Sequence, residues 1–85
     1  MMKPKKLQEL LAEFLRENEL DVVYGIGAFS GGHCVINENR VVVVNKRMPV
    51  EEQLRIFVSV ILELQLDYSR IKKEARDYIE RYIKP

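Results

Sequence analysis

The chain has little of several features that would point to a particular class of protein. It contains one cysteine, Cys34, and no tryptophan. A single cysteine cannot form a disulfide within the chain, which excludes the small secreted domains held together by disulfides. No apolar run approaches the ~20 residues needed to cross a bilayer. The first residues pass directly into an amphipathic pattern without the apolar stretch of a signal peptide, so we expect a cytoplasmic protein without membrane association.

Charge of one sign is not in excess either. Fourteen Lys and Arg residues and thirteen Asp and Glu residues give a net charge of +1. Because nucleic-acid binding depends on a marked basic excess or a basic face, we expect no nucleic-acid partner. We interpret the short basic run of Lys3, Lys5 and Lys6 as a solvated chain end. Charged residues make up 32% of the chain, above the typical ~25%, and this composition resembles that of heat-adapted proteins.

What is present is enough for one folded domain. The chain has 85 residues, of which 47% are apolar, and a single domain usually has about 50–200 residues. An apolar fraction of this size is ordinary for globular proteins and supports a core. We therefore expect a single α+β domain over residues 1–85.

The N-terminal segment has helical periodicity. Its apolar residues fall at the spacing of one helix face: Leu7, Leu10, Leu11, Phe14 and Leu15. Pro4 suits the first turn of a helix, where its missing N–H has no intrahelical partner. The pattern predicts a helix over residues 4–19, ending at Asn18 or Glu19.

The middle of the chain has the composition of strands. Val22–Tyr24, His33–Ile36 and Arg40–Asn45 are rich in β-branched residues. Asn37–Asn39 predicts a tight turn between the last two, since Asn tolerates the positive φ of hairpin turns. The unbroken valine run at 41–44 indicates a strand covered on both faces, or nearly so. We expect a small antiparallel sheet of two to three strands that includes this hairpin.

A second helix begins near Pro49, which fits a first turn, and Glu51 and Glu52 suit the positive end of its dipole. Between residues 54 and 66, apolar side chains cover most of the circumference of this helix. Only a narrow polar stripe interrupts them: Arg55, Ser59 and Glu63. A helix this apolar is normally buried on several sides, so we expect it at the centre of the core.

The C-terminal third allows two interpretations. Apolar residues from Val50 to Tyr82 step by three and four without Gly or Pro, which is typical of one long helix in a coiled coil. Asp67 and Ser69, however, are good N-cap residues and favour a break near 66–71 before a further helix over 68–84. We predict two helices packed on the sheet, with one long helix as the alternative. The long helix would need a partner chain.

All four glycines lie between Gly25 and Gly32. The dinucleotide fingerprint G-x-G-x-x-G needs a third glycine where this chain has Ser30, and it should open a helix. Here a predicted strand follows instead. We therefore interpret the glycines as bends, positive φ angles and close backbone approach.

His33 and Cys34 are the only histidine and the only cysteine, and they are adjacent. On a strand they point to opposite faces, which makes a nucleophile–base pair difficult. One His and one Cys are too few for a tetrahedral zinc site unless a second chain contributes ligands. We predict no catalytic residue, no metal and no cofactor. Residues for a hypothetical small-ligand site are the following: Gly31, Gly32, His33, Cys34, Asn45 and Arg47.

Asn45 and Arg47 belong to this set because they lie in the link between the valine strand and the next helix. Asn45 suits a turn, where it satisfies backbone groups or caps the helix start. Lys46 and Arg47 near a helix N-terminus suit an anion. We favour the structural role over anion binding.

The stretch from Val41 to Asp67 resembles the zinc-peptidase core of the ImmA/IrrE type, in which a strand ending near an Asn leads into a helix bearing His-Glu-x-x-His. Glu63 matches the general base, but Leu62 and Leu66 occupy both zinc-ligand positions. The resemblance implies a zincin-like scaffold that is catalytically dead. The segment from Gly31 to Pro49 also resembles a small bacterial family of unknown function.

Three hypotheses for function follow from these patterns. The first is a non-catalytic interaction or structural domain that self-associates through its C-terminal helices, as a homo-oligomer or with a protein partner. The second is a small-ligand or metal-binding module centred on the glycine loop, His33, Cys34 and Arg47. The third is a minor enzyme that uses Glu63 or Cys34.

Overall fold

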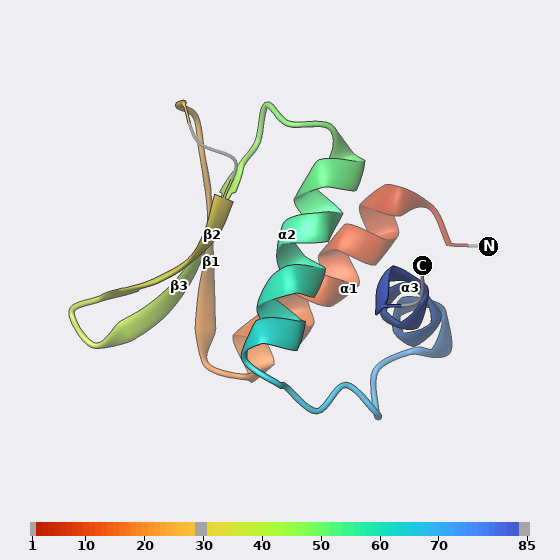
Figure 1. Ribbon diagram of the computed structural model, residues 1–85. Helices are drawn as coiled ribbons and strands as arrows, with labels where there is room; N and C mark the ends of the chain where they lie inside the picture. The colour runs from red at the N-terminus through yellow and green to blue at the C-terminus, as the bar shows by residue number, and fades with distance from the viewer. Residues whose placement is uncertain (1, 29–30, 84–85) are drawn as a thin grey trace.

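The computed structural model describes residues 2–28 and 31–83, which form two layers (Figure 1). A three-stranded sheet makes one layer and the helices make the other, so the α+β class is confirmed. The elements are, in order, α1 (Pro4–Glu17), β1 (Leu20–Gly25), β2 (Gly31–Ile36), β3 (Asn39–Asn45), α2 (Val50–Glu63) and α3 (Lys73–Ile83).

The sheet has the strand order β1-β3-β2 and is mixed. β2 runs antiparallel to β3, whereas β1 runs parallel to β3 with Val22 opposite Val42. The prediction of an antiparallel sheet was therefore wrong for β1. The physical reason is the path of the chain. β2 reverses the direction of β1, and the hairpin reverses it again, so β3 returns parallel to β1 and lies between the other two strands.

The hairpin between β2 and β3 is tighter than the three residues expected for it. Ile36 pairs with Asn39, which leaves Asn37 and Glu38 as a two-residue turn. Their φ angles are +50° and +69°. Positive φ at both central positions is the geometry whose twist matches the flanking strands, and Asn adopts it at low cost. The predicted turn is confirmed.

The core lies between the sheet and the helices. Val42 and Val44 of β3 are fully buried beneath α2, whose Phe57 is also fully buried. α2 packs on α1 as well as on β2 and β3, whereas α3 packs on α1. The prediction that both C-terminal helices pack on the sheet was therefore wrong for α3. The nearly all-round apolarity of α2 is thus satisfied within one chain, as a central core helix. Ala75 and Ile79 attach α3 to the same core.

α2 ends in a Schellman motif at a residue that is not glycine. Gln65 has a φ of +54°. Its N–H donates to the Leu62 carbonyl at 3.1 Å, and the N–H of Leu66 donates to the Ile61 carbonyl at 3.0 Å. These two bonds satisfy carbonyls that a helix end leaves without partners. The helix therefore stops at Glu63, and the alternative of one long helix is wrong.

The connection from α2 to α3 is held by a local turn. Ser69 donates its N–H to Oδ1 of Asp67 at 3.0 Å, and Arg76 of α3 reaches back to the Ser69 carbonyl at 3.1 Å. The hydrogen bonds from Ser69 lower the pKa of Asp67 from its usual 3.8. The predicted break near 66–71 is confirmed, although α3 begins later than expected, at Lys73.

Candidate functional site

One face of the sheet carries none of the helices of residues 2–28 and 31–83 (Figure 1). Side chains alternate along strands, and Val42 and Val44 point into the core. Their neighbours in sequence, Val41 and Val43, and the residues paired in register with those two therefore point away from the helices. We call this surface the open valine face, and its apolar or weakly polar members are Val23, Cys34, Ile36, Val41 and Val43. Of the four valines predicted to be covered on both faces, or nearly so, three are buried although no described helix lies on this side: Val41, Val42 and Val44.

The open valine face is unusually apolar for a sheet surface. Val23 is 48% exposed and Ile36 51% exposed, whereas Val41 is 7% exposed. The solvent face of a two-layer sheet normally alternates to polar residues. Among strand positions on this side, Asp21 is the one charged residue, and it lies at the end of the sheet near the hairpin. Lys46 and Arg47 follow β3 and lie at the opposite end of the sheet from Asp21.

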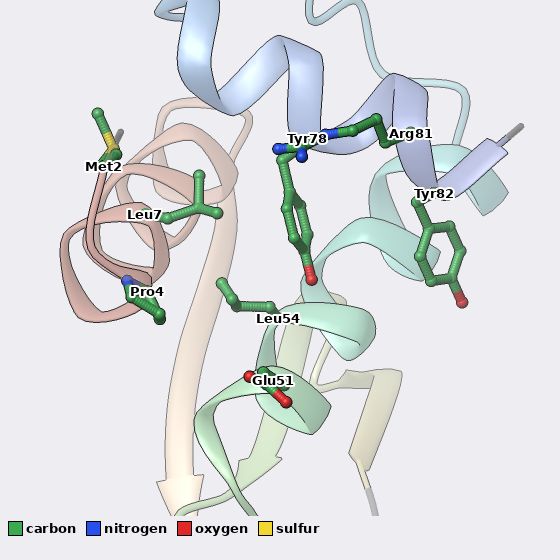
Figure 2. A pocket seen from close by; sticks show the side chains of 8 residues that line it. All are labelled: Met2, Pro4, Leu7, Glu51, Leu54, Tyr78, Arg81 and Tyr82. Carbon is green, nitrogen blue, oxygen red and sulfur yellow. The ribbon is translucent and has the colours of Figure 1, made fainter.

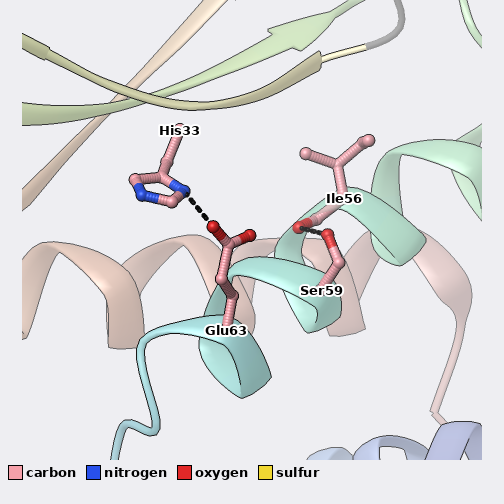
Figure 3. A network of polar contacts seen from close by, with 4 residues as sticks. All are labelled: His33, Ile56, Ser59 and Glu63. Atoms are coloured by element: carbon pink, nitrogen blue, oxygen red, sulfur yellow. Dashed lines mark hydrogen bonds and ion pairs between the residues drawn. The ribbon is translucent and has the colours of Figure 1, made fainter.

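His33 and Cys34 diverge as predicted. His33 lies opposite Val42, on the helix side, and its Nδ1 is 3.7 Å from Oε1 of Glu63 on α2 (Figure 3). Cys34 lies opposite Val41, is exposed, and belongs to the open valine face. The two side chains do not share a site. His33 instead links the edge strand to the last turn of the core helix.

The glycines at the start of β2 serve the backbone. Gly31 and Gly32 have φ angles of +138° and +151°. A β-carbon at Gly31 would lie 2.7 Å from the Val43 carbonyl oxygen and 3.2 Å from Cγ1 of Ile56, whereas one at Gly32 would meet nothing within 4 Å. The predicted roles of positive φ and close backbone approach are confirmed here. Ser30 falls outside the described residues.

The side chain of Asn45 joins the segment after β1 to the turn after β3 through hydrogen bonds. It is 6% exposed, donates Nδ2 to the Gly27 carbonyl at 2.9 Å and accepts the Arg47 N–H on Oδ1 at 3.0 Å. It thereby satisfies backbone groups in the turn, one of the two structural roles expected of it. The six ligand candidates are thus distributed over three places: Gly31 and His33 on the helix side, Gly32 and Cys34 on the open face, and Asn45 and Arg47 at the turn before α2.

Gln53 is a buried polar residue that the sequence interpretation missed. It is 6% exposed, donates Nε2 to the Met48 carbonyl at 2.8 Å and accepts a hydrogen bond from Gln8 of α1. Buried amides need such partners, because an unsatisfied amide costs free energy. A glutamine next to the apolar stretch of α2 was the available signal. Its role is to join α1, α2 and the turn that precedes α2.

The geometry of α2 bears on the zincin resemblance. His-Glu-x-x-His places both zinc ligands on one helix, whereas α2 ends at Glu63 and Leu66 lies beyond it. Glu63 is 65% exposed and contacts His33. Within residues 2–28 and 31–83, no group of three His, Cys, Asp or Glu side chains is placed to hold a metal ion. The relationship to this scaffold stays a prediction.

A groove of about 420 Å³ opens between α1, α2 and α3 (Figure 2). It lies where the first turns of α1 and α2 meet the last turns of α3. Its walls are mostly apolar and aromatic, with one acidic and one basic side chain. The side chains of the groove are Met2, Pro4, Leu7, Glu51, Leu54, Tyr78, Arg81 and Tyr82.

Comparison of the chain with protein-family models, curated proteins and solved structures finds no match. The functional argument therefore rests on the surfaces themselves. Over the part of the chain that the structure describes, no helix combines the length and apolarity needed to span a membrane.

Proposed function

We propose that this protein is a non-catalytic interaction domain that self-associates by packing its open valine face against the same face of a second copy. The observation that supports this is the apolar surface of the sheet opposite the helices, with Val23 and Ile36 about half exposed. Burying apolar surface contributes about 25 cal/mol per Å². Two sheets that stack face to face, about 10 Å apart, remove such surfaces from water together.

The exposed area of the chain agrees with a missing partner. The protein exposes 5961 Å², whereas a monomer of 10.0 kDa is expected to expose about 5,200 Å². The excess of about 700 Å² is close to the ~800 Å² that each partner buries in a standard interface. A second copy that covered the open valine face would remove an area of this size from water.

Charge favours one orientation of the two copies. Asp21 lies at the hairpin end of the open valine face, and Lys46 and Arg47 follow β3 at the opposite end. A two-fold axis perpendicular to the strands would bring each Asp21 toward the partner's Lys46 and Arg47. An axis parallel to the strands would bring the two acidic ends together instead. Charges of opposite sign across an interface fix its register.

This proposal moves the interface away from the C-terminal helices. Self-association through those helices was expected from the apolarity of residues 54–66, but α2 uses these side chains within its own chain. On α3, Tyr82 is 40% exposed and Ile83 51% exposed. An interface there remains the alternative hypothesis, and the experiment below separates the two.

The test compares two lysine substitutions by sedimentation equilibrium. Val23→Lys places a charge on the open valine face, and Val35→Lys is its control because Val35 is 64% exposed on the other side of the sheet. We expect twice the 10.0 kDa chain mass for the native protein and for Val35→Lys, and the chain mass for Val23→Lys. A monomeric native protein would contradict the proposal. Dissociation by Ile83→Lys and not by Val23→Lys would move the interface to α3.

The other two hypotheses receive less support. A ligand module built on His33 and Cys34 needs both side chains at one place, and they lie on opposite faces. The order of β3, Asn45, Pro49 and α2 is compatible with a catalytically dead zincin-like scaffold. That relationship would describe ancestry and would leave the interaction role unchanged.

A further inference from the structure

Half of the backbone groups of β2 face the free edge of the sheet. Within the part of the chain that the structure describes, β2 pairs with β3 alone. Bonded and non-bonded residue pairs alternate along two antiparallel strands, and Ile36 and Asn39, which close the two-residue turn, form a bonded pair. The N–H and C=O groups of every second residue of β2 therefore point away from β3, toward the edge. These residues are Gly31, His33 and Val35.

β2 lacks the features that usually prevent an edge strand from pairing further. Natural edge strands carry lysine, proline or a bulge for this purpose. The sequence of β2 contains neither lysine nor proline, and its register with β3 is continuous from Gly31 to Ile36. β1, at the other edge, carries the charge of Asp21. β2 is therefore the edge that suits the addition of a further strand.

The side chains of an added strand would alternate between two environments. On one side they would extend the open valine face beyond Cys34. On the other side they would lie beside His33 and Val35, next to α2. Ile56 and Glu63 of α2 are directed toward β2 there (Figure 3). Apolar or β-branched residues suit these positions, except for the one beside Glu63.

Glu63 determines the charge that fits this position. Its side chain is 65% exposed and lies 3.7 Å from Nδ1 of His33, which is longer than a hydrogen bond. The carboxylate can therefore accept hydrogen bonds from a cation on an added strand, opposite His33. A second charge on this side, Arg40, pairs with Val35 from β3, so β2 separates it from the edge.

The same carboxylate disfavours a second copy of this chain at the edge. Two β2 strands paired antiparallel in one sheet would have both Glu63 side chains on the same side of that sheet. Like charges across a strand pair are destabilising, whereas opposite charges are favourable. The edge therefore suits a different chain that has a basic residue at this position.

We propose that the free edge of β2 binds an extended segment of a partner protein as an added antiparallel strand, with a lysine or arginine opposite His33. Backbone hydrogen bonds with His33 and Val35 provide the affinity, and the ion pair with Glu63 provides the sequence preference. This interaction goes beyond self-association, because it uses the edge of the sheet and not the open valine face.

The test titrates a synthetic peptide, acetyl-Val-Thr-Lys-Thr-Val-amide, into ¹⁵N-labelled protein. Its lysine is designed to lie opposite His33, and its valines to lie on the same side of the sheet as that lysine. We expect the amide signals of His33 and Val35 to shift with one dissociation constant, because their N–H groups gain acceptors. The amide of Val58, buried on α2, should not shift. No binding, or shifts that leave out His33 and Val35, would overturn the proposal.

Two N-methylated peptides test the backbone pairing while the protein stays unchanged. N-methylation of the lysine removes the donor to the His33 carbonyl and should weaken binding by about tenfold. N-methylation of the following threonine alters an N–H that points away from β2, so the affinity should stay nearly unchanged. Equal losses for the two peptides, or the larger loss for the threonine, would contradict an antiparallel strand at this edge.

A double-mutant cycle tests the charge. Replacing the lysine of the peptide by norleucine, or Glu63→Gln in the protein, should each weaken binding about two- to fivefold, and both changes together should cost little more than one. Glu52→Gln, an exposed acid in the first turn of α2, is the control and should have no effect. Equal affinities of native protein and Glu63→Gln for the lysine peptide would overturn the preference for a basic partner.

This proposal and self-association fail separately. Val23→Lys should change the mass of the particle and leave the affinity for the peptide intact. Loss of peptide binding in Val23→Lys would place the peptide on the open valine face and overturn the edge assignment. Shifts of the His33 and Val35 amides when Val23→Lys is concentrated without peptide would show that a second copy occupies the edge, which would overturn the assignment to a partner protein.

Discussion

Gly31 and Ile56 lie so close that no other residue fits the first position without a shift. A β-carbon at Gly31 would be 3.2 Å from Cγ1 of Ile56 and 2.7 Å from the Val43 carbonyl oxygen. The missing side chain lets the edge strand β2 approach α2. The same approach brings His33, two residues further along β2, to Glu63 at the end of α2 (Figure 3).

The two adjacent glycines form a matched pair for measuring this contact. Both have positive φ, so alanine at either position should cost about 1–3 kcal/mol in backbone strain. Gly31→Ala should lose a further ~1–3 kcal/mol through overpacking, because only Gly31 lacks space. Urea unfolding measures both losses. Equal losses for Gly31→Ala and Gly32→Ala would show that the contact with Ile56 is unimportant.

Asn45 should contribute more to stability than an exposed asparagine. Its side chain joins the Gly27 carbonyl and the Arg47 N–H while 6% exposed. Asn45→Ala removes both hydrogen bonds, each of which contributes about 0.5–1.5 kcal/mol, so we expect a total cost of about 1–3 kcal/mol. Asn39→Ala, at an exposed position of the same strand, is the control and should change the free energy of unfolding by less than about 0.5 kcal/mol. Similar losses in the free energy of unfolding for Asn45→Ala and Asn39→Ala would contradict this role of the Asn45 hydrogen bonds.

Tyr78 should make stability fall at high pH. Burial raises the pKa of Tyr78 above its usual 10.0, and Glu51 raises it further. As pH rises, the unfolded chain therefore loses the tyrosine proton before the folded chain does. The free energy of unfolding consequently decreases as pH rises past about 10. Urea unfolding of Tyr78→Phe should show a shallower decrease. Parallel curves for the two proteins would contradict this sign.

The reactivity of the Cys34 thiol measures whether the open valine face is covered. The exposed thiol lies on the surface that the second copy should cover. Its reaction with a maleimide should slow as protein concentration rises, and Val23→Lys should react at one rate at all concentrations. A rate that stays constant while the native protein passes from monomer to dimer would place the interface elsewhere.

Features set by neighbouring residues could be predicted from the sequence. The stripe of α1, the turn at Asn37 and the acidic start of α2 each depend on spacing or local backbone chemistry. The parallel pairing of β1 with β3 depends on contacts between distant segments, which no local pattern records. Asp67 and Ser69 indicated a break after α2, but its exact end at Glu63 was not predictable, because Gln65 adopts a φ that usually indicates glycine.

The candidate surfaces were predictable only in part. Alternation on a strand was enough to separate His33 from Cys34. A run of four valines, however, contains no sign of which side the helices cover, since every position is apolar. The groove and the hydrogen bond from Gln8 to Gln53 join residues of different helices. They exist only once the helices have packed.

The most direct test of the account is an isotope-filtered NOE spectrum of an equimolar mixture of ¹³C-valine-labelled and unlabelled protein. Only contacts between copies give signals in this experiment. The account predicts intermolecular NOEs between the methyls of Val23 or Val43 and protons of the partner's open valine face. Valine NOEs to Tyr82 and Ile83 of the partner's α3 alone, or no intermolecular NOEs at concentrations where the particle is dimeric, would contradict it.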